Sequence, residues 1–169
     1  MEENARASNE AEGEPDETAA AGALELDRFL PYRLAVLAHE VSRALSSIYR
    51  DRFGLSVPEW RVIANLGRHQ PMSSNRIAEL GSMDKAKVSR AVARLVEAGL
   101  ITRETDARDN RLIVLKLSAR GRRIHNKIAP LALAWEAELL DALTPDERES
   151  FDRLVAKLQT RAEALRERG

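Results

Sequence analysis

The chain of 169 residues contains no cysteine. This absence excludes disulfide bonds, cysteine nucleophiles, thiolate zinc sites and thiol-based redox sensing. The three histidines, His39, His69 and His125, are far apart in the sequence, so we expect neither a metal site nor a cofactor. Aromatic residues are scarce at 4%, while charged residues reach 32%, a composition typical of a helix-rich soluble protein.

Long apolar segments are also missing. No apolar run approaches the ~20 residues that a membrane-spanning helix requires. The N-terminus is acidic, whereas a secretory signal begins with a basic and then an apolar segment. We therefore expect a cytoplasmic protein that does not interact with membranes.

The formal net charge of zero conceals an uneven distribution. Residues 1–25 carry eight acids and one base, a net charge of −7, whereas residues 26–169 carry 26 bases against 19 acids, a net charge of +7. Because residues 1–25 contain almost no large apolar side chain, we predict a disordered acidic tail. A solubilising role is the simpler interpretation of the tail, and competition with DNA for a basic surface is the alternative.

Two helices are predicted after the tail. Apolar residues three and four positions apart predict a long helix over residues 27–52, ended by Gly54. Its apolar face comprises Leu30, Leu34, Leu37, Val41, Leu45 and Ile48. The segment from Ser56 to Glu59 is a capping box with a proline in the first turn, and it predicts a helix to about Gly67. The inner face of this second helix is Trp60, Ile63 and Leu66.

A pair of short helices separated by a glycine-containing turn follows, which is the pattern of a helix-turn-helix. The first is capped by Ser73, carries Ile77 and Leu80 and is stopped by Gly81. The second is capped by Asp84 and ends at Gly99, with an inner stripe of Val88, Val92 and Leu95.

The rest of the chain predicts two strands and two further helices. Residues 100–104 and 112–117 have the β-branched and apolar content of strands, joined by a charged loop over residues 105–111. Ser118 can cap a helix to about Leu143, which Pro130 should bend, and a capping box starting at Thr144 opens the last helix. The first of these helices is expected to have Ile124, Ile128, Leu131, Trp135 and Leu139 inside. The last helix has Phe151, Leu154, Leu158 and Leu165 on one face.

The outer face of the helix over residues 84–98 is basic and predicts contact with the major groove of DNA. Arg90 is the candidate for two hydrogen bonds to guanine, and Ser89 for a base edge or a phosphate. Lys85, Lys87 and Arg94 are expected to neutralise phosphates. Taken alone, this face could also be an ordinary solvated surface. The first turn of the preceding helix offers backbone N–H groups to a phosphate, with the side chains of Ser73, Ser74, Asn75 and Arg76 beside them.

The loop between the two strands resembles the tip of a DNA-binding wing. Asp106, Asp109 and Asn110 favour the turn, while Arg108 and Arg111 are expected to reach a narrow minor groove. The acids are also expected to pair with the arginines and stiffen the loop. An ordinary charged hairpin is the alternative for the loop in isolation.

Together these segments resemble the MarR family of bacterial regulators over roughly residues 26–165. The most specific motifs are D-x-R-D-x-R at residues 106–111 and Leu-Ser-x-x-Gly at residues 117–121. The resemblance implies a mainly helical α+β fold, with a winged helix-turn-helix lobe at residues 56–118 and dimerisation helices at residues 26–53 and 119–169. It also implies an obligate homodimer on a near-palindromic operator in double-stranded DNA. Most relatives are repressors released by a small ligand, often an aromatic acid or a phenolic compound, and the resemblance implies the same here.

In this family the ligand typically lies between the dimerisation helices and the DNA-binding lobe. In this sequence the matching positions are Tyr32, His39, Arg43, Trp60, Arg61 and Asn65. Arg43 or Arg61 could pair with a carboxylate, and Trp60 could stack on a ring. The alternative is that Trp60 belongs to the core, that His39 is an ordinary histidine, and that both arginines are surface charges.

The two alternative classes of function are a protein-interaction module and an enzyme. A winged helix can be a protein-interaction module without direct DNA binding, but that use requires an apolar outer face on the helix over residues 84–98, where the sequence places lysine and arginine. An enzyme is not expected. The sequence shows no framed pair of carboxylates, no glycine-rich phosphate loop and no Ser–His arrangement typical of a nucleophile.

Overall fold

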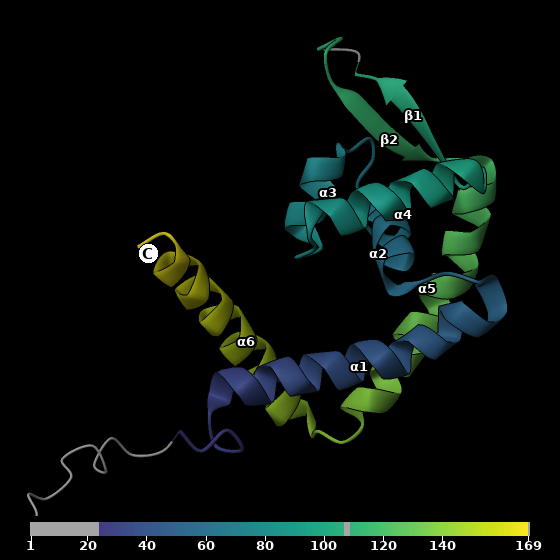
Figure 1. The fold of residues 1–169 in the computed structure, drawn as a ribbon. Coiled ribbons are helices and arrows are strands. Elements are labelled where there is room, and N and C mark those ends of the chain that lie inside the picture. Colours follow the sequence, from purple (N-terminus) through teal and green to yellow (C-terminus); the bar gives the residue numbers. More distant parts are fainter. Residues whose placement is uncertain (1–23, 107–108, 169) are drawn as a thin grey trace, which may run out of the picture. The chain divides into compact units, whose positions relative to one another are not determined.

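The computed structural model describes residues 24–106 and 109–168 as six helices and one two-stranded sheet (Figure 1). Contacts divide the chain into two units that meet within the first helix, one ending at His39 and one beginning at Glu40. In the described part, no helix is long and apolar enough to cross a membrane. The elements are α1 (Leu30–Phe53), α2 (Val57–Arg68), α3 (Ser74–Leu80), α4 (Lys85–Glu97), β1 (Ile101–Thr105), β2 (Ile113–Leu117), α5 (Ala119–Leu140) and α6 (Pro145–Arg166).

The first unit contains the N-terminal part of α1. The predicted apolar stripe is present here, but its side chains are exposed, as Leu34 and Leu37 show at 45% and 51%. No residue of the helix before Ser46 is buried. The N-terminal half of α1 therefore presents an exposed apolar face.

The core of the second unit is formed by α2, α3, α4 and the base of the sheet, which pack on one another (Figure 1). Burial of these apolar side chains is the main favourable term that holds the helices together. α4 contributes a stripe that is at most 2% exposed, formed by Val88, Ala91, Val92 and Leu95. The predicted inner residues of α2 are also buried, and Val62, which was not predicted, is fully buried with them.

The predicted caps are present and explain where the helices begin. Ser73 accepts the backbone N–H of Arg76 at the start of α3, and Asp84 accepts those of Ala86 and Lys87 at the start of α4. These side chains satisfy backbone donors that have no partner inside the helix. The Thr144 capping box opens α6 as predicted, and the hydrogen bonds to the Glu147 carboxylate lower the pKa of that group.

The two strands pair antiparallel, in a register that runs from Ile101 opposite Leu117 to Thr105 opposite Ile113. At the base of this wing Ile101, Leu115 and Leu117 are buried against the lobe. On the other face Lys116 and Glu104 form an ion pair of 2.6 Å between the strands. The strand pair predicted from the sequence is confirmed to within one residue at each start.

A close backbone contact requires glycine at position 121, four residues after the second strand. The Ser118 backbone N–H donates to the Leu100 carbonyl over 3.0 Å, and the Ser118 hydroxyl accepts the N–H of Gly121 over 3.0 Å. A Cβ atom at position 121 would lie 2.0 Å from the Leu100 carbonyl oxygen. Only glycine allows α5 to begin this close to the start of the wing.

Two expectations for α5 are wrong in detail. The helix ends at Leu140, not at about Leu143, and it contains Pro130. Of its predicted inner residues only Ile128 is buried, and Leu139 is 44% exposed. In α3 the predicted Ile77 is buried and Leu80 is 46% exposed. A periodic pattern reveals an apolar face, but burial also requires a neighbouring element that covers it.

Candidate DNA-binding surface

The outer face of α4 carries the predicted reading residues. Lys85, Lys87, Ser89 and Arg90 are all exposed, whereas the opposite stripe of the helix is buried in the lobe. The arrangement follows from the 3.6-residue period, which separates the two faces. A polar face near the N-terminus of a helix is the geometry that the major groove accepts.

Arg94 differs from its neighbours because it has a protein partner that the sequence did not predict. Its Nε lies 2.9 Å from Oε1 of Glu59 in α2, and the side chain of Glu59 is only 10% exposed. The arginine was expected to neutralise a phosphate. In the structure its guanidinium is already paired with a nearly buried carboxylate.

A groove of about 410 Å³ separates the first turn of α3 from the wing. Ser73, Ser74 and Asn75 line its helical side, and Arg103 and Arg111 line its wing side with apolar residues of β2. The structure thus brings the predicted residues of α3 close to the wing. Arg76 is exposed in the same turn and pairs with Glu79 at 3.1 Å.

Arg103 was missed by the sequence analysis. It is opposite Leu115 in the register and lies two residues beyond the buried Ile101 in the same strand, so its side chain belongs to the face of the wing that turns toward the lobe. Strand alternation from Ile101 was the signal that could have identified it. Among the described residues no ion pair to Arg103 is found.

The described part of the wing tip is organised by aspartates, as expected. Asp106 accepts the N–H of Asp109 over 3.1 Å, and Asp109 pairs with the Arg111 guanidinium over 3.1 Å. The hydrogen bond from the Arg111 side chain, followed by that from its backbone, lowers the pKa of Asp109. The prediction that acids and arginines pair in this loop is confirmed for this pair. Arg108 lies outside the described residues.

The predicted ligand residues are distributed over the two units, and each is described within its own unit. Tyr32 and His39 are exposed and belong to the first unit. Arg43 is exposed in the second unit and pairs with Glu40 of its own helix at 2.7 Å. The Asn65 side chain donates to the Arg61 carbonyl in its own helix over 2.8 Å.

Trp60 is a core residue, which was the alternative interpretation. Its ring is stacked with Tyr49 at 5.7 Å and with His125 at 6.1 Å between centroids, and only 8% of the residue is exposed. A Cβ atom on Gly67 would lie 2.2 Å from the His125 ring, so this glycine makes room for the stack. Little of the Trp60 ring is available to a ligand.

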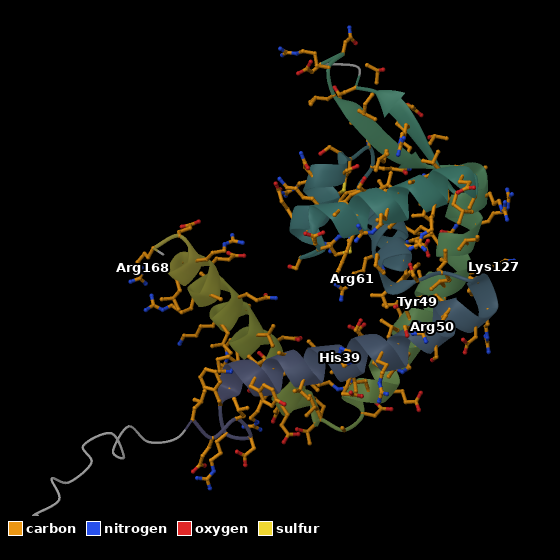
Figure 2. The ribbon with its side chains drawn as sticks, in the orientation of Figure 1. His39, Tyr49, Arg50, Arg61, Lys127 and Arg168 are labelled. Atoms are coloured by element: carbon orange, nitrogen blue, oxygen red, sulfur yellow. The ribbon has the colours of Figure 1, made fainter. Side chains whose placement is uncertain are left out.

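Arg61 contacts the turn of the helix-turn-helix. Its Nη1 donates to the Gly81 carbonyl over 3.3 Å. Tyr49 and Arg50 are adjacent residues in the last part of α1, and Figure 2 labels them together with Arg61. Burial raises the pKa of the Tyr49 hydroxyl, and the positive charges of Arg61 and Arg50 partly oppose the rise.

The wing tip generates a prediction about pKa. Substituting Arg111→Ala removes the donor that favours the charged form of Asp109, so the pKa of Asp109 should rise toward the ordinary aspartate range. The contribution of the pair to wing stability is present above that range and is lost as the pH falls through the lowered pKa. A carboxyl-carbon NMR titration of both proteins measures the shift. An identical Asp109 titration in the two proteins would show that the pair is absent in solution.

Comparisons with known proteins agree with this geometry. The MarR family profile matches residues 53–123. An HTH-type transcriptional repressor of Mycobacterium tuberculosis is 30% identical over 131 residues, which are 77% of this chain and 91% of the relative. A crystal structure of a MarR/EmrR family transcriptional regulator from Acinetobacter matches with a TM-score of 0.77 and 26% identity, over 83% of this chain and 99% of that one.

The fold also occurs in a solved protein–DNA complex. The structure of the MepR–DNA complex of S. aureus matches with a TM-score of 0.71 and 20% identity, over 79% of this chain and 98% of that one. At this identity the likeness concerns the fold alone. The expected fold class and the expectation that the chain is not an enzyme are confirmed. The chain belongs to the MarR family of winged helix-turn-helix, DNA-binding transcriptional regulators.

Proposed function

We propose that this regulator binds a near-palindromic operator as a homodimer and represses transcription until a small ligand releases it. The observation that carries the proposal is an exposed basic face of α4 in the same lobe as a groove between α3 and the wing. Lys85, Lys87 and Arg90 are exposed on α4, and Arg103 and Arg111 line that groove opposite the first turn of α3. One lobe can therefore offer a helix to the major groove and a wing to the adjacent backbone or minor groove.

The proposed roles follow from the chemistry of each side chain. Arg90 carries a planar fork that matches the O6 and N7 atoms of guanine, and Ser89 is beside it for a base edge or a phosphate. Lys85 and Lys87 are point charges suited to phosphates. Arg103 adds a phosphate contact from the wing, since no ion pair in the described part of the chain neutralises it. The first turn of α3 and the arginines of the wing complete the proposed surface.

Arg90 and Lys87 should respond differently to substitution. Arg90→Ala removes a base contact, so operator affinity should fall by about 1–3 kcal/mol while affinity for random DNA changes little. Lys87→Ala removes a phosphate contact, so affinity should fall on every sequence and the salt slope should shrink by roughly 0.9. Titrations of operator and random duplexes at several salt concentrations measure both effects.

Two results would contradict these assignments. Equal losses on operator and random DNA for Arg90→Ala would show that Arg90 does not read a base. A wild-type chain that binds no duplex at low salt would exclude DNA binding and favour the protein-interaction module.

The proposed homodimer is supported by apolar faces that the described chain leaves open. Leu30, Leu34 and Leu37 of α1 are exposed, and no residue of α6 is buried. The exposed large apolar residues of α6 are Phe151, Leu154, Leu158 and Leu165. Apolar stripes of this size on two helices are characteristic of an interface rather than of a solvated surface.

A charge placed in the α6 stripe should prevent association. Leu158→Arg puts a guanidinium where we expect a desolvated contact, so the protein should sediment as a monomer and lose operator affinity. Gln159→Arg adds the same charge at the next position, outside the stripe, and should leave the dimer intact. Sedimentation velocity distinguishes the species. A wild-type chain that stays monomeric at micromolar concentration would refute the dimer.

The proposed effector is an anionic aromatic compound, and Arg61 is the residue that the structure favours for its carboxylate. Arg61 is half-buried and, within the described residues, is in no ion pair. Its bond to the Gly81 carbonyl joins it to the helix-turn-helix turn, so a ligand that recruits the guanidinium could affect α4. Tyr32, His39, Arg43 and Asn65 remain candidates for the same ligand. Trp60 is the weakest candidate because its ring is buried.

A panel of aromatic carboxylic acids and their thioesters tests the effector. A true effector should raise the melting temperature of the free protein and weaken operator binding, since it must favour a state that binds DNA less well. Arg61→Gln should abolish both responses to a carboxylate ligand, while Arg43→Gln tests the second arginine. If no compound changes either quantity, the effector proposal is wrong.

A further inference from the structure

We propose that Arg94 and Glu59 form a brace that sets the orientation of α4, so that Arg94 directs the DNA-reading face without itself contacting DNA. The inference rests on the proposed DNA-binding function of α4 and assigns a positioning role to one of its cations. It also assigns a role to Glu59, a nearly buried carboxylate that DNA binding alone would not require.

The contact joins two helices through a carboxylate whose oxygens are both occupied. Oε2 of Glu59 accepts the backbone N–H of Ser56 over 2.7 Å and the Ser56 hydroxyl over 2.6 Å. Oε1 lies 2.9 Å from Nε of Arg94. A charged group that is only 10% exposed requires such donors to offset its lost hydration. Glu59 is thus fixed to the start of α2 and presents one oxygen to α4.

This geometry gives the packing of α4 a direction that its apolar stripe lacks. Burial of Val88, Ala91, Val92 and Leu95 favours contact with the lobe, but apolar contact has no preferred angle. The ion pair holds one point of α4 against one point of α2, because Nε of Arg94 lies 2.9 Å from Oε1 of Glu59. It therefore limits the rotation of α4 about its own axis.

Arg90 is the residue most affected by such a rotation. It precedes Arg94 by one helical turn and is displaced by only about 40° around the helix axis. A rotation that releases Arg94 from Glu59 therefore changes the direction of the Arg90 side chain. Hydrogen bonds from Arg90 to a base edge depend on the position of its side chain and are lost when the helix rotates. The flexible lysines of α4 can still reach phosphates.

The substitution Glu59→Gln separates the brace from the helix cap. Glutamine is accepted at this position of a capping box, so the start of α2 should be retained. The ion pair with Arg94 is lost, because an amide carries no charge. The matched control is Glu97→Gln, which removes the same charge from an exposed residue of α4 that is in no ion pair within the described chain.

The brace and a phosphate contact predict opposite results. If Arg94 braces α4, Glu59→Gln should lower the ratio of operator to random-DNA affinity by about tenfold, the scale of one misdirected base contact. Arg94→Gln should lower the ratio similarly and leave the salt slope unchanged, and the double variant should be no worse than either single one. If Arg94 instead binds a phosphate, Glu59→Gln should strengthen binding to all DNA, and Arg94→Gln should reduce the salt slope by roughly 0.9.

The free protein provides a readout that folding stability alone would not change. The side-chain Nε NMR resonance of Arg94 should shift in Glu59→Gln, because the paired carboxylate charge is lost, but not in Glu97→Gln. An unchanged Arg94 resonance in Glu59→Gln, or an unchanged affinity ratio in that variant, would overturn the brace. A wild-type protein that binds no operator would refute the proposed function itself, and that result is distinct from a failure of the variant alone.

Discussion

The buried stripe of α4 is the constraint on which the proposed DNA-binding surface depends. Val88, Ala91, Val92 and Leu95 are at most 2% exposed, and their burial forces the opposite side of the helix outward. Gly99, at a φ of +65°, then ends α4 and turns the chain into β1. Ile101 returns to the core two residues later. The proposed recognition helix and the wing are therefore attached to the same small core within a few residues.

The parts of the fold that depend on local pattern could be predicted from the sequence. The period of apolar residues identified α2 and α4, and Ser73, Asp84, Ser118 and Thr144 marked helix starts that the structure confirms. These signals are readable because the caps and the residues they satisfy are only two or three positions apart. Hydrogen bonds between residues this close in the chain can be predicted from the sequence alone.

Contacts between distant residues could not be predicted in the same way. Arg94 meets Glu59 and Arg61 meets the Gly81 carbonyl across different elements. A single arginine in a sequence has no period that reveals its partner, so all exposed cations of α4 were assigned to DNA alike. Arg103 was not predicted because it belongs to β1 and lies outside the charged loop that marks the wing in the sequence. Such pairings require the three-dimensional packing.

In α1 and α6 the spacing of apolar residues predicted an apolar face but not what would cover it. The apolar faces of α1 and α6 are where the periodicity predicted them, yet Leu34 and Leu158 are 45% and 47% exposed. Their sequence pattern is that of a core, and within the described chain nothing encloses them. A second copy of the chain is the cover that the proposed function supplies, and it would double the positive charge of residues 26–169 on one DNA duplex.

Hydrogen–deuterium exchange of the full-length protein, with and without an operator selected from random duplexes, tests the central claim most directly. The account predicts that DNA slows exchange in the N-terminal half of α4, in the first turn of α3 and in the two strands of the wing, while the outer faces of α5 and α6 remain unchanged. Slower exchange confined to α5 or α6, with α4 and the wing unaffected, would contradict it.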